Sequence, residues 1–379
     1  MNALDRIAAV TVKEFRHLGR DPRSLIMVLL LPVAMMLLFG YAISFDVTHV
    51  PTVVVDNDRT PASRDYLAHY EGSPFFTIVE RADELRAIDQ AFGANRARIG
   101  VVVPAGFERS LATDTPAEIA VLIDGTEPTA ARVAQAYTTA LNQLVGQQLT
   151  LSWADAKGYD LTAAGVLEPR VRTWYNPERR SAVFLIPGLM VAIISIVTIQ
   201  QTAVSLVRER DLGTADQLAV SPIRMPELML GKLLPWTVLA FLEVVAITAV
   251  AIGLFAVPLH GDPLLLIGGA ALFVFCCLGM GLVISAVAPS VDVANILALM
   301  VAFLPAFLLS GFIFPLDQIP TALQWVSAAF PARYMVDIAR GIFLKASGWT
   351  ELWPQFAALA AYAVLALLLA SVLYRRRSA

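Results

Sequence analysis

Long apolar runs separated by shorter polar segments make up most of this chain. A helix that crosses a bilayer needs about 20 apolar residues, and six runs of this kind can be recognised. They span residues 25–45, 182–207, 233–257, 264–288, 293–314 and 355–374. Glu243, in the third run, is the only acidic or basic side chain within them. The pattern predicts an α-helical integral membrane protein with six transmembrane helices.

The segment before the first run has a helical periodicity. Its apolar residues fall on one face of a helical wheel and its basic residues on the opposite face. The apolar set is Leu4, Ile7, Ala8, Val12, Phe15 and Leu18, and the basic set is Lys13, Arg16 and Arg20. We expect residues 1–23 to form an amphipathic helix on the membrane surface; the alternative is a basic flank that only sets the topology. The first transmembrane helix, residues 24–45, is longer than the apolar core of a signal peptide, so we expect it to be retained.

Residues 46–181, between the first two runs, have the charge content of a soluble protein. Strands are predicted at 52–55, 75–79, 98–103 and 118–123, and helices at 62–70, 82–92, 105–111 and 129–156. This alternation predicts an α/β domain. Long loops cross a membrane regardless of their charge, so the domain can be extracytoplasmic despite its arginines.

Basic residues near the ends of the runs predict the orientation. They are Arg6, Lys13, Arg16, Arg20 and Arg23 before the first run, and Arg375, Arg376 and Arg377 after the last. Since basic flanks stay inside, both termini face the cytoplasm, as six spans require. The connection between the second and third runs is then cytoplasmic too, as is the tail at 375–379.

Composition supports the same class of protein. The chain is 57% hydrophobic and 16% charged, with a mean hydropathy of +0.66, whereas soluble domains are about a quarter charged. A net charge of −3 and the lack of basic clusters mixed with aromatic residues argue against nucleic-acid binding. The two cysteines, Cys276 and Cys277, are adjacent within the fourth run, where apolar packing is the simplest interpretation.

Motifs for catalysis or cofactor binding are not found. The Gly231-Lys232 pair is followed by Leu and has Pro226 where a P-loop needs its first glycine. The sequence Asp56-Asn57-Asp58 lacks the spaced ligands of a calcium loop and is better explained as a turn into a helix capped near Thr60. The four histidines match no zinc spacing, and no nucleophile elbow occurs. We therefore expect no cofactor or metal bound by this chain, and no enzymatic activity of its own.

A charged segment between the second and third runs has the signals of a short helix. Gly213 permits a turn, Thr214 and Gln217 fit a capping box, and Ser221-Pro222 ends the helix. We predict a helix near residues 213–221 at the cytoplasmic face; a solvated loop is the alternative.

These residues resemble a known family. RERDLGTADQLAVSPIRMPELMLGKLLPW (208–236) and LSGFIFPLDQIPTALQWVSAAFPARYMVDIARGIFLKASGW (309–349) are similar to segments of ABC transporter permeases of the second type. VVVDNDRTPASRDY and KEFRHLGRDPRSLIMVLLLPVAMMLLFGY resemble the drug-efflux-like subgroup with a large extracytoplasmic domain. The resemblance covers essentially the whole chain.

The resemblance implies an exporter permease in the bacterial inner membrane. Two permeases, identical or sister chains, would pair and bind two separate ATPase subunits, which hold the ATP and magnesium. The 213–221 helix would be the coupling helix that docks on the ATPase. Its predicted coupling residues are Arg208, Glu209, Arg210, Asp211, Gly213, Thr214, Asp216 and Gln217. A periplasmic adaptor leading to an outer-membrane channel is a further expected partner. Apolar drugs, lipids, glycolipids and peptides all remain candidate substrates.

Polar residues within the spans are candidates for the transport pathway. They are Glu243, Gln200, Gln201 and Asn295. Glu243 is costly to bury unless it is paired or hydrated, and a structural hydrogen bond to another helix is an equal alternative. Residues 315–354 are polar and rich in proline, and the family places short re-entrant helices there.

Two other functions remain open on sequence alone. One is a receptor or signalling anchor whose outer domain binds a ligand. The other is a secondary transporter with Glu243 as its proton site.

Overall fold

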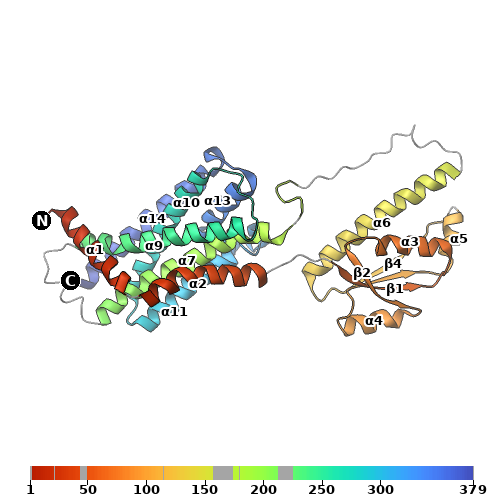
Figure 1. Ribbon diagram of the computed structural model, residues 1–379, viewed down its shortest axis with the longest axis horizontal. Coiled ribbons are helices and arrows are strands. Elements are labelled where there is room, and N and C mark those ends of the chain that lie inside the picture. Colours follow the sequence, from red (N-terminus) through yellow and green to blue (C-terminus); the bar gives the residue numbers. More distant parts are fainter. Residues whose placement is uncertain are drawn as a thin grey trace. The chain divides into compact units, whose positions relative to one another are not determined.

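A computed structural model shows two compact units, residues 1–44 with 173–379 and residues 45–172. It describes residues 2–20, 22–42, 49–113, 115–156, 174–178, 180–211 and 225–378. The two units are described separately below (Figure 1).

The smaller unit is an α/β domain with a four-stranded sheet in the order β2-β1-β3-β4. Its elements are β1 (Val50–Asp56), α3 (Pro61–Glu71), β2 (Phe76–Ala82), α4 (Leu85–Gly93), β3 (Ile99–Val103), α5 (Phe107–Ala112), β4 (Ala120–Ile123) and α6 (Pro128–Ala156). Strand β1 is parallel to both neighbours, whereas β4 runs antiparallel to β3. All eight predicted elements are present, with shifts of a few residues at their ends.

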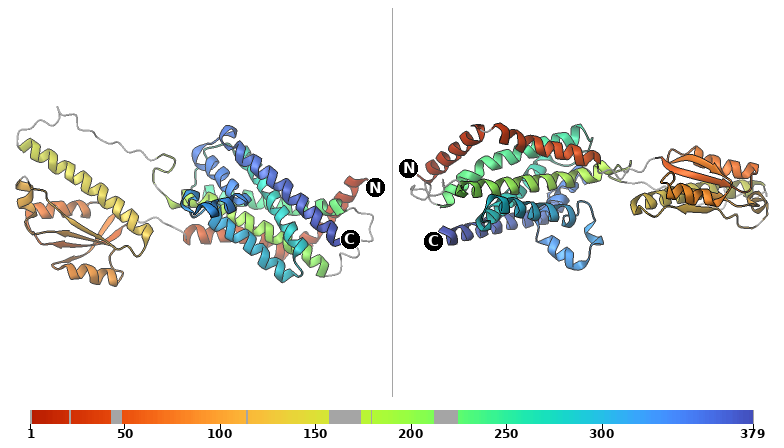
Figure 2. Two further views of the ribbon diagram at one scale, coloured as in Figure 1. Left: turned by 180° about the vertical axis from the view of Figure 1, so that it is seen from behind. Right: turned by 90° about the horizontal axis from the view of Figure 1, so that it is seen from below.

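Both faces of the sheet are covered by helices. Helix α4 lies on one face, and α3 and α6 lie on the other (Figures 1 and 2). In β1, Val54 belongs to the apolar cluster under α3 and α6, and Val53 and Val55 belong to the cluster under α4. A strand buried on both faces reads as a continuous apolar run, which explains the sequence Val53-Val54-Val55.

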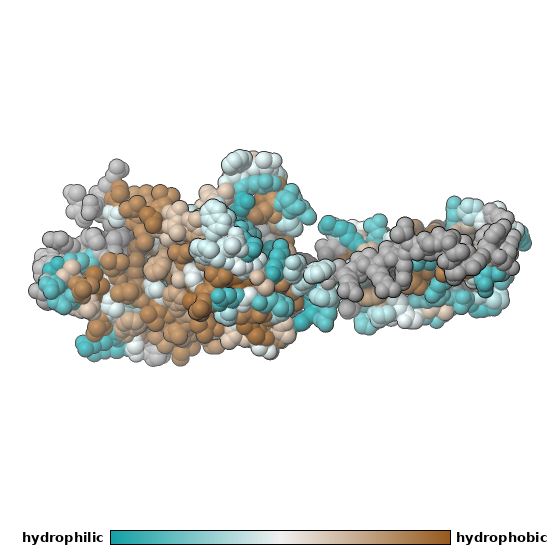
Figure 3. Space-filling view, turned by 90° about the horizontal axis from the view of Figure 1, so that it is seen from above, coloured by the Kyte–Doolittle hydropathy of each residue, from teal (hydrophilic) through white to brown (hydrophobic). Residues whose placement is uncertain are grey.

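The larger unit is a helical bundle. Its helices are α1 (Ala3–Arg20), α2 (Pro22–Ala42), α7 (Ser181–Asp211), α9 (Met225–Gly253), α10 (Pro263–Val287), α11 (Val291–Leu304), α12 (Thr321–Ala328), α13 (Pro331–Lys345) and α14 (Trp349–Ser378). Helix α11 continues as a π-helical turn, η2 (Pro305–Leu309), and a 3-10 turn, η3 (Leu316–Gln318), precedes α12. The face of this unit seen in Figure 3 is largely apolar, as expected for a surface in contact with lipid.

Five helices of the described part of the chain are long and apolar enough to cross a membrane. They lie in α7, α9, α10, α11 with η2, and α14, and correspond to the second to sixth predicted spans. The first predicted span corresponds to α2, whose described apolar stretch, Val28–Ala42, is shorter. The chain is therefore a multi-pass membrane protein, and the sixth crossing stays a prediction.

Helix α7 is the centre of the bundle. It contacts α2, α9, α10, α11 and α13, and every residue from 185 to 199 is buried. A helix that is apolar all round is one that other helices surround. A movement of α7 would therefore change its contacts with five other helices of the bundle.

The predicted re-entrant region, 315–354, contains η3, α12 and α13, while its last six residues, 349–354, belong to the long helix α14. Arg340 of α13 donates hydrogen bonds to the carbonyl oxygens of Gly311 and Phe312, both at 2.8 Å. Its guanidinium lies 3.9 Å from the centre of the Phe184 ring. This side chain ties α13 to the chain after η2 and to α7. Whether these short helices enter the membrane stays a prediction.

Candidate functional site

The predicted coupling helix lies outside the described residues, with Gly213, Thr214, Asp216 and Gln217. The structure does describe the helices on either side of it. Helix α7 ends at Asp211 and α9 begins at Met225. Arg208, Glu209, Arg210 and Asp211 form the last turn of α7, and the side chain of Arg208 is exposed. The coupling role of all eight residues stays a prediction.

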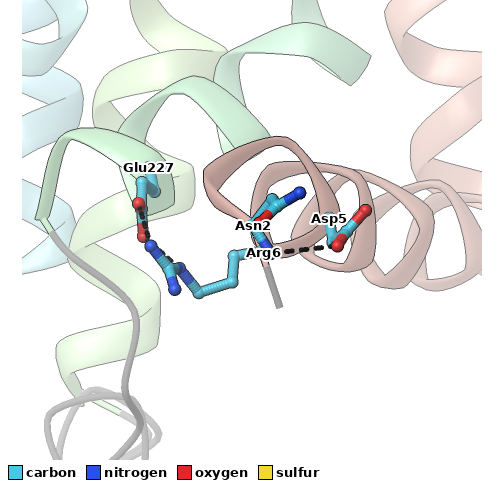
Figure 4. Close-up of polar contacts among 4 residues, drawn as sticks. All are labelled: Asn2, Asp5, Arg6 and Glu227. Carbon is cyan, nitrogen blue, oxygen red and sulfur yellow. Dashed lines mark hydrogen bonds and ion pairs between the residues drawn. The ribbon is translucent and has the colours of Figure 1, made fainter.

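Helix α1 is attached to the beginning of α9 by a two-pronged ion pair. Nε of Arg6 donates to Oε2 of Glu227 at 2.7 Å, and Nη2 of Arg6 donates to Oε1 at 2.6 Å (Figure 4). The side chains of Arg6 and Glu227 are 20% and 9% exposed. Paired hydrogen bonds between a guanidinium and a carboxylate are strong and fix orientation. Glu227 also lies in the first turn of α9, where the helix dipole favours a negative charge.

A close backbone contact extends this attachment by one turn. The Thr11 hydroxyl lies within hydrogen-bond distance of two carbonyl oxygens, that of Ile7 in its own helix at 2.9 Å and that of Gly231 in α9 at 3.1 Å, which share its one proton. A Cβ at Gly231 would lie 2.7 Å from Cβ of Val10 and 3.0 Å from the carbonyl oxygen of Ile7. Only glycine permits this approach of α1 to α9. Helix α1 is therefore fixed to the helix that follows the predicted coupling segment.

Most of the predicted apolar face of α1 does not pack on the protein, although Leu18 at its end is buried with Val28 of α2 and Leu239 of α9. Leu4, Val12 and Phe15 are exposed, whereas Val10 and Glu14 are buried. Glu14 pairs with Lys13 and interacts electrostatically with Lys232 of α9, which is also buried. The helical wheel divided the residues of α1 by polarity alone. It therefore did not identify the side with Val10 and Glu14, which packs on the protein although it contains a charge. That the exposed apolar residues lie on the membrane surface stays a prediction.

The four candidate transport residues form two separate pairs. Gln200 of α7 donates through Nε2 to Oδ1 of Asn295 in α11 at 3.1 Å. Gln201 and Glu243 line a small cavity bounded by α2, α7 and α9. Successive residues of a helix point about 100° apart, so the adjacent glutamines reach different neighbours. The two pairs therefore lie at different places around α7.

The carboxyl group of Glu243 is almost completely enclosed. Its residue is 2% exposed, and Oε1 has no hydrogen-bond partner in the described part of the chain. The same holds for Oγ1 of Thr198 in α7, which is 5% exposed and lines the same cavity. Sequence reasoning missed Thr198, because a single threonine within a long apolar run is not a signal by itself.

Asp56 and Asp58 lie at the turn between β1 and α3, as predicted, and Asp56 accepts hydrogen bonds from the backbone N–H groups of Asp58 and Arg59. Asp58 accepts hydrogen bonds from the Thr60 hydroxyl at 2.6 Å and from the backbone N–H groups of Gly106 and Glu108 at 2.6 and 3.0 Å. Thr60 and Ser63 form a capping box at the start of α3, which confirms the predicted cap. The bond from Thr60, followed by those from the backbone amides, lowers the pKa of Asp58.

Comparison with known proteins decides the family. The family described as ABC-2 family transporter protein matches residues 22–372. The chain belongs to this family.

Three similar proteins come from Escherichia coli (strain K12). The chain is 33% identical over 342 residues to the "Probable multidrug ABC transporter permease YbhS", covering 89% of this chain and 88% of that protein. It is 28% identical over 353 residues to the "Probable multidrug ABC transporter permease YbhR", covering 92% and 94%. It is 27% identical over 371 residues to the "Inner membrane transport permease YhhJ", covering 95% and 94%.

As an ABC-2 family member, the chain is a transporter permease subunit rather than a receptor or signalling anchor. Permeases of this family lack an ATPase domain of their own, and membership implies ABC ATPase subunits as partners. The resemblance seen in the sequence is thereby confirmed.

Proposed function

We propose that this chain is the membrane subunit of an ATP-driven exporter. It moves an apolar or amphipathic compound, such as a drug-like molecule or a lipid, out of the cytoplasm or the inner leaflet of the bacterial inner membrane. It works as a pair of permeases, two copies or this chain with a sister permease, bound to two ATPase subunits through residues 213–221. Both termini are cytoplasmic and the α/β domain is extracytoplasmic, where a periplasmic adaptor leading to an outer-membrane channel would meet it.

One observation carries the proposal: the segment 212–224 joins the most buried helix of the bundle to the helix that α1 holds. A force applied there by an ATPase acts on the end of α7, which contacts five other helices. It also acts on the start of α9, which the Arg6–Glu227 pair ties to α1. Packed elements of this kind switch between discrete arrangements rather than deforming gradually. The segment is therefore well placed to convert closure of an ATPase dimer into rearrangement of the spans.

The test combines binding and transport. The full chain is expressed with its candidate ATPase, the complex is purified, and uptake of a fluorescent amphipathic cation is measured in inside-out vesicles. We expect co-purification and ATP-dependent uptake, and we expect both to be lost with Glu209→Arg or with a Gly/Ser replacement of residues 213–220. Glu118→Arg, an equal charge change at an exposed position of the α/β domain, is the matched control and should preserve both.

The secondary-transporter alternative gives the opposite pattern. Uptake would then continue without ATP, stop when a protonophore collapses the proton gradient, and be unaffected by Glu209→Arg. That result, or the absence of any contact with an ATPase, would contradict the proposal.

A further inference from the structure

A cavity opens in the α/β domain between helices α3, α5 and α6 (Figure 1). Its volume is about 230 Å³. A cavity of about 150 Å³ can hold one benzene ring, and sites for drug-sized ligands begin near 300 Å³. An α-helix with its side chains is at least about 10 Å across, which is too wide to enter. The size therefore fits a small organic molecule with one ring or a short alkyl chain.

The helices around the cavity are held together by direct contacts. The hydroxyl groups of Tyr66 and Tyr70 in α3 donate to Oδ1 of Asn142 in α6, at 2.6 and 3.1 Å. The ring of Tyr66 also packs on that of Phe107, the first residue of α5, with 5.8 Å between the ring centres. The cavity is therefore preformed, as sites for small ligands usually are.

The inner part of the cavity is apolar. Tyr66, Phe107 and Val145 line it and are 7%, 3% and 3% exposed. The half-buried apolar residues of the lining are Ala62, Leu111 and Leu149. All six belong to the core cluster on this side of the sheet or pack against it. A ring or an alkyl chain placed here would continue that core, and removal of its surface from water favours binding.

The remaining lining residues are polar and lie nearer the solvent. Asp65 and His69 are one turn apart on α3, and the first is exposed and the second half-buried. Gln148 and Ser152 are one turn apart on α6, and both are exposed. Residues four apart lie on the same side of a helix, so each helix contributes one polar pair to the mouth of the cavity. All four side chains contain an atom that can accept a hydrogen bond.

The charge at the mouth selects the kind of ligand. Among the described residues that line the cavity, Asp65 is the one with a full charge at neutral pH, and none is Lys or Arg. A nearby carboxylate favours a cation and disfavours an anion. A primary ammonium group donates three hydrogen bonds and accepts none, which matches a mouth that offers several acceptors.

We propose that this cavity binds a small primary amine, with its ammonium group at Asp65 and its apolar body against Tyr66 and Phe107. Binding combines an ion pair at the mouth with burial of one ring or alkyl chain inside. The binding site does not depend on the proposed function. Its use in receiving an exported cation on the outer side of the membrane rests on that function.

Methyl NMR of the full chain in lipid nanodiscs tests the proposal, with phenethylamine as the probe. The lining contains methyl groups whose signals locate the probe in the cavity, whereas probe dissolved in lipid shifts signals of the bundle. They belong to Ala62, Leu111, Val145 and Leu149. We expect these signals to shift with a Kd on the order of 1 mM, a typical affinity for so small a ligand. 2-Phenylethanol, which lacks the charge, should bind more weakly, and the anion 3-phenylpropionate should bind more weakly still.

Two substitutions separate the ion pair from the apolar contacts. Asp65→Asn should weaken phenethylamine binding by about threefold to fivefold, as expected for a partly exposed ion pair, and should leave 2-phenylethanol binding unchanged. Ser152→Trp should fill the mouth and abolish binding of both. The matched controls are Asp89→Asn in α4, across the sheet, and Thr139→Trp in α6, both at exposed positions outside the lining. Both controls should bind phenethylamine as the parent protein does.

Three results would each overturn the proposal. They are the absence of shifts at the four lining methyl groups, equal affinity for phenethylamine and 2-phenylethanol, and unchanged phenethylamine binding in Asp65→Asn. The methyl spectrum without ligand shows whether a variant is folded, and Asp65→Asn, at an exposed position, decides the outcome if Ser152→Trp is not. Normal binding without ATP-driven uptake would count against the proposed function alone. ATP-driven uptake without binding in the cavity would count against this inference alone.

Discussion

The α/β domain and the helical bundle differ in where their apolar side chains lie. In the α/β domain the apolar side chains of the central strand β1 are inside, as with Val53 and Val55, which are fully buried, and apolar side chains such as Leu85 and Leu144 are exposed only on the covering helices and at the sheet's edge. In the bundle, large apolar side chains lie both inside and outside, and Leu365 of α14 is 65% exposed. The bilayer is as apolar as the protein interior, so hydrophobicity does not distinguish the two sides of a transmembrane helix. Polar contacts such as Arg6–Glu227 and Gln200–Asn295 supply much of the specificity there.

The largest difference in stability is expected for a leucine-to-alanine substitution made once in each unit. Leu67→Ala in α3, at a position 3% exposed, should destabilise the α/β domain by about 2–5 kcal/mol through lost burial and cavity formation. Leu365→Ala in α14 should have little effect, because its side chain moves between lipid-like environments. Protease resistance of each unit during heating measures both. Equal losses of protease resistance in the two variants would contradict this difference between the α/β domain and the bundle.

The Arg6–Glu227 ion pair between α1 and α9 should give the next largest effect. Arg6→Glu places two carboxyl groups opposite each other, so ATP-driven uptake should fall several-fold as α1 separates from α9. The charge-swapped pair Arg6→Glu with Glu227→Arg should recover much of the activity. Arg16→Glu, on an exposed position of the same helix, is the matched control and should be nearly neutral. Failure of the swapped pair to recover would mean that the contact does not act through charge.

The Gln200–Asn295 hydrogen bond tests a smaller polar contact between spans. Gln200→Leu should lower bundle stability by about 1 kcal/mol, the usual net contribution of one hydrogen bond. The double variant Gln200→Leu with Asn295→Leu should be closer to the parent protein, because no polar group is then left without a partner. Thermal unfolding in nanodiscs reports the difference. A double variant as unstable as the sum of the single variants would contradict this pairing.

The smallest expected effect is a pH dependence confined to the α/β domain. Because hydrogen bonds from Thr60 and the backbone lower the pKa of Asp58 below its ordinary 3.8, ionised Asp58 stabilises the domain above that value. This contribution decreases as the pH falls through the lowered pKa of the folded state. Asp58→Asn should therefore reduce the acid sensitivity of the domain's melting temperature while leaving that of the bundle unchanged. An identical pH profile in the variant would show that Asp58 contributes nothing.

Much of the fold could be predicted from the sequence, but for different reasons in the two units. In the α/β domain, Thr60 and the run Val53-Val54-Val55 carried local signals, and the predicted cap and strand are present. In the bundle, run length located the spans, because a bilayer requires a minimum apolar length. The order of the strands and the neighbours of each helix could not be derived, since they depend on contacts between residues far apart in sequence.

The candidate site was predictable only in part. Glu243, Gln200, Gln201 and Asn295 could be selected because polar residues are rare in apolar runs. Their division into two pairs could not be foreseen. Nor could the place of Thr198 in the same cavity lining as Glu243, or the ion pair of Glu227 with Arg6. Thr198 resembles any other small residue of a transmembrane helix until α9 brings Glu243 to the same cavity.

The sequence by itself determined that the chain crosses the membrane several times, carries an α/β domain and lacks a P-loop. These features follow from local composition, apolar length and motif spacing, which folding does not alter. Only the tertiary structure decided that α7 is enclosed by its neighbours, that α1 is tied to α9 through Arg6 and Glu227, and that Glu243 and Thr198 share one cavity. Those facts depend on which helix faces are brought together, and in a bilayer apolar residues on every face leave that choice to a few polar groups and to the close approach that Gly231 permits.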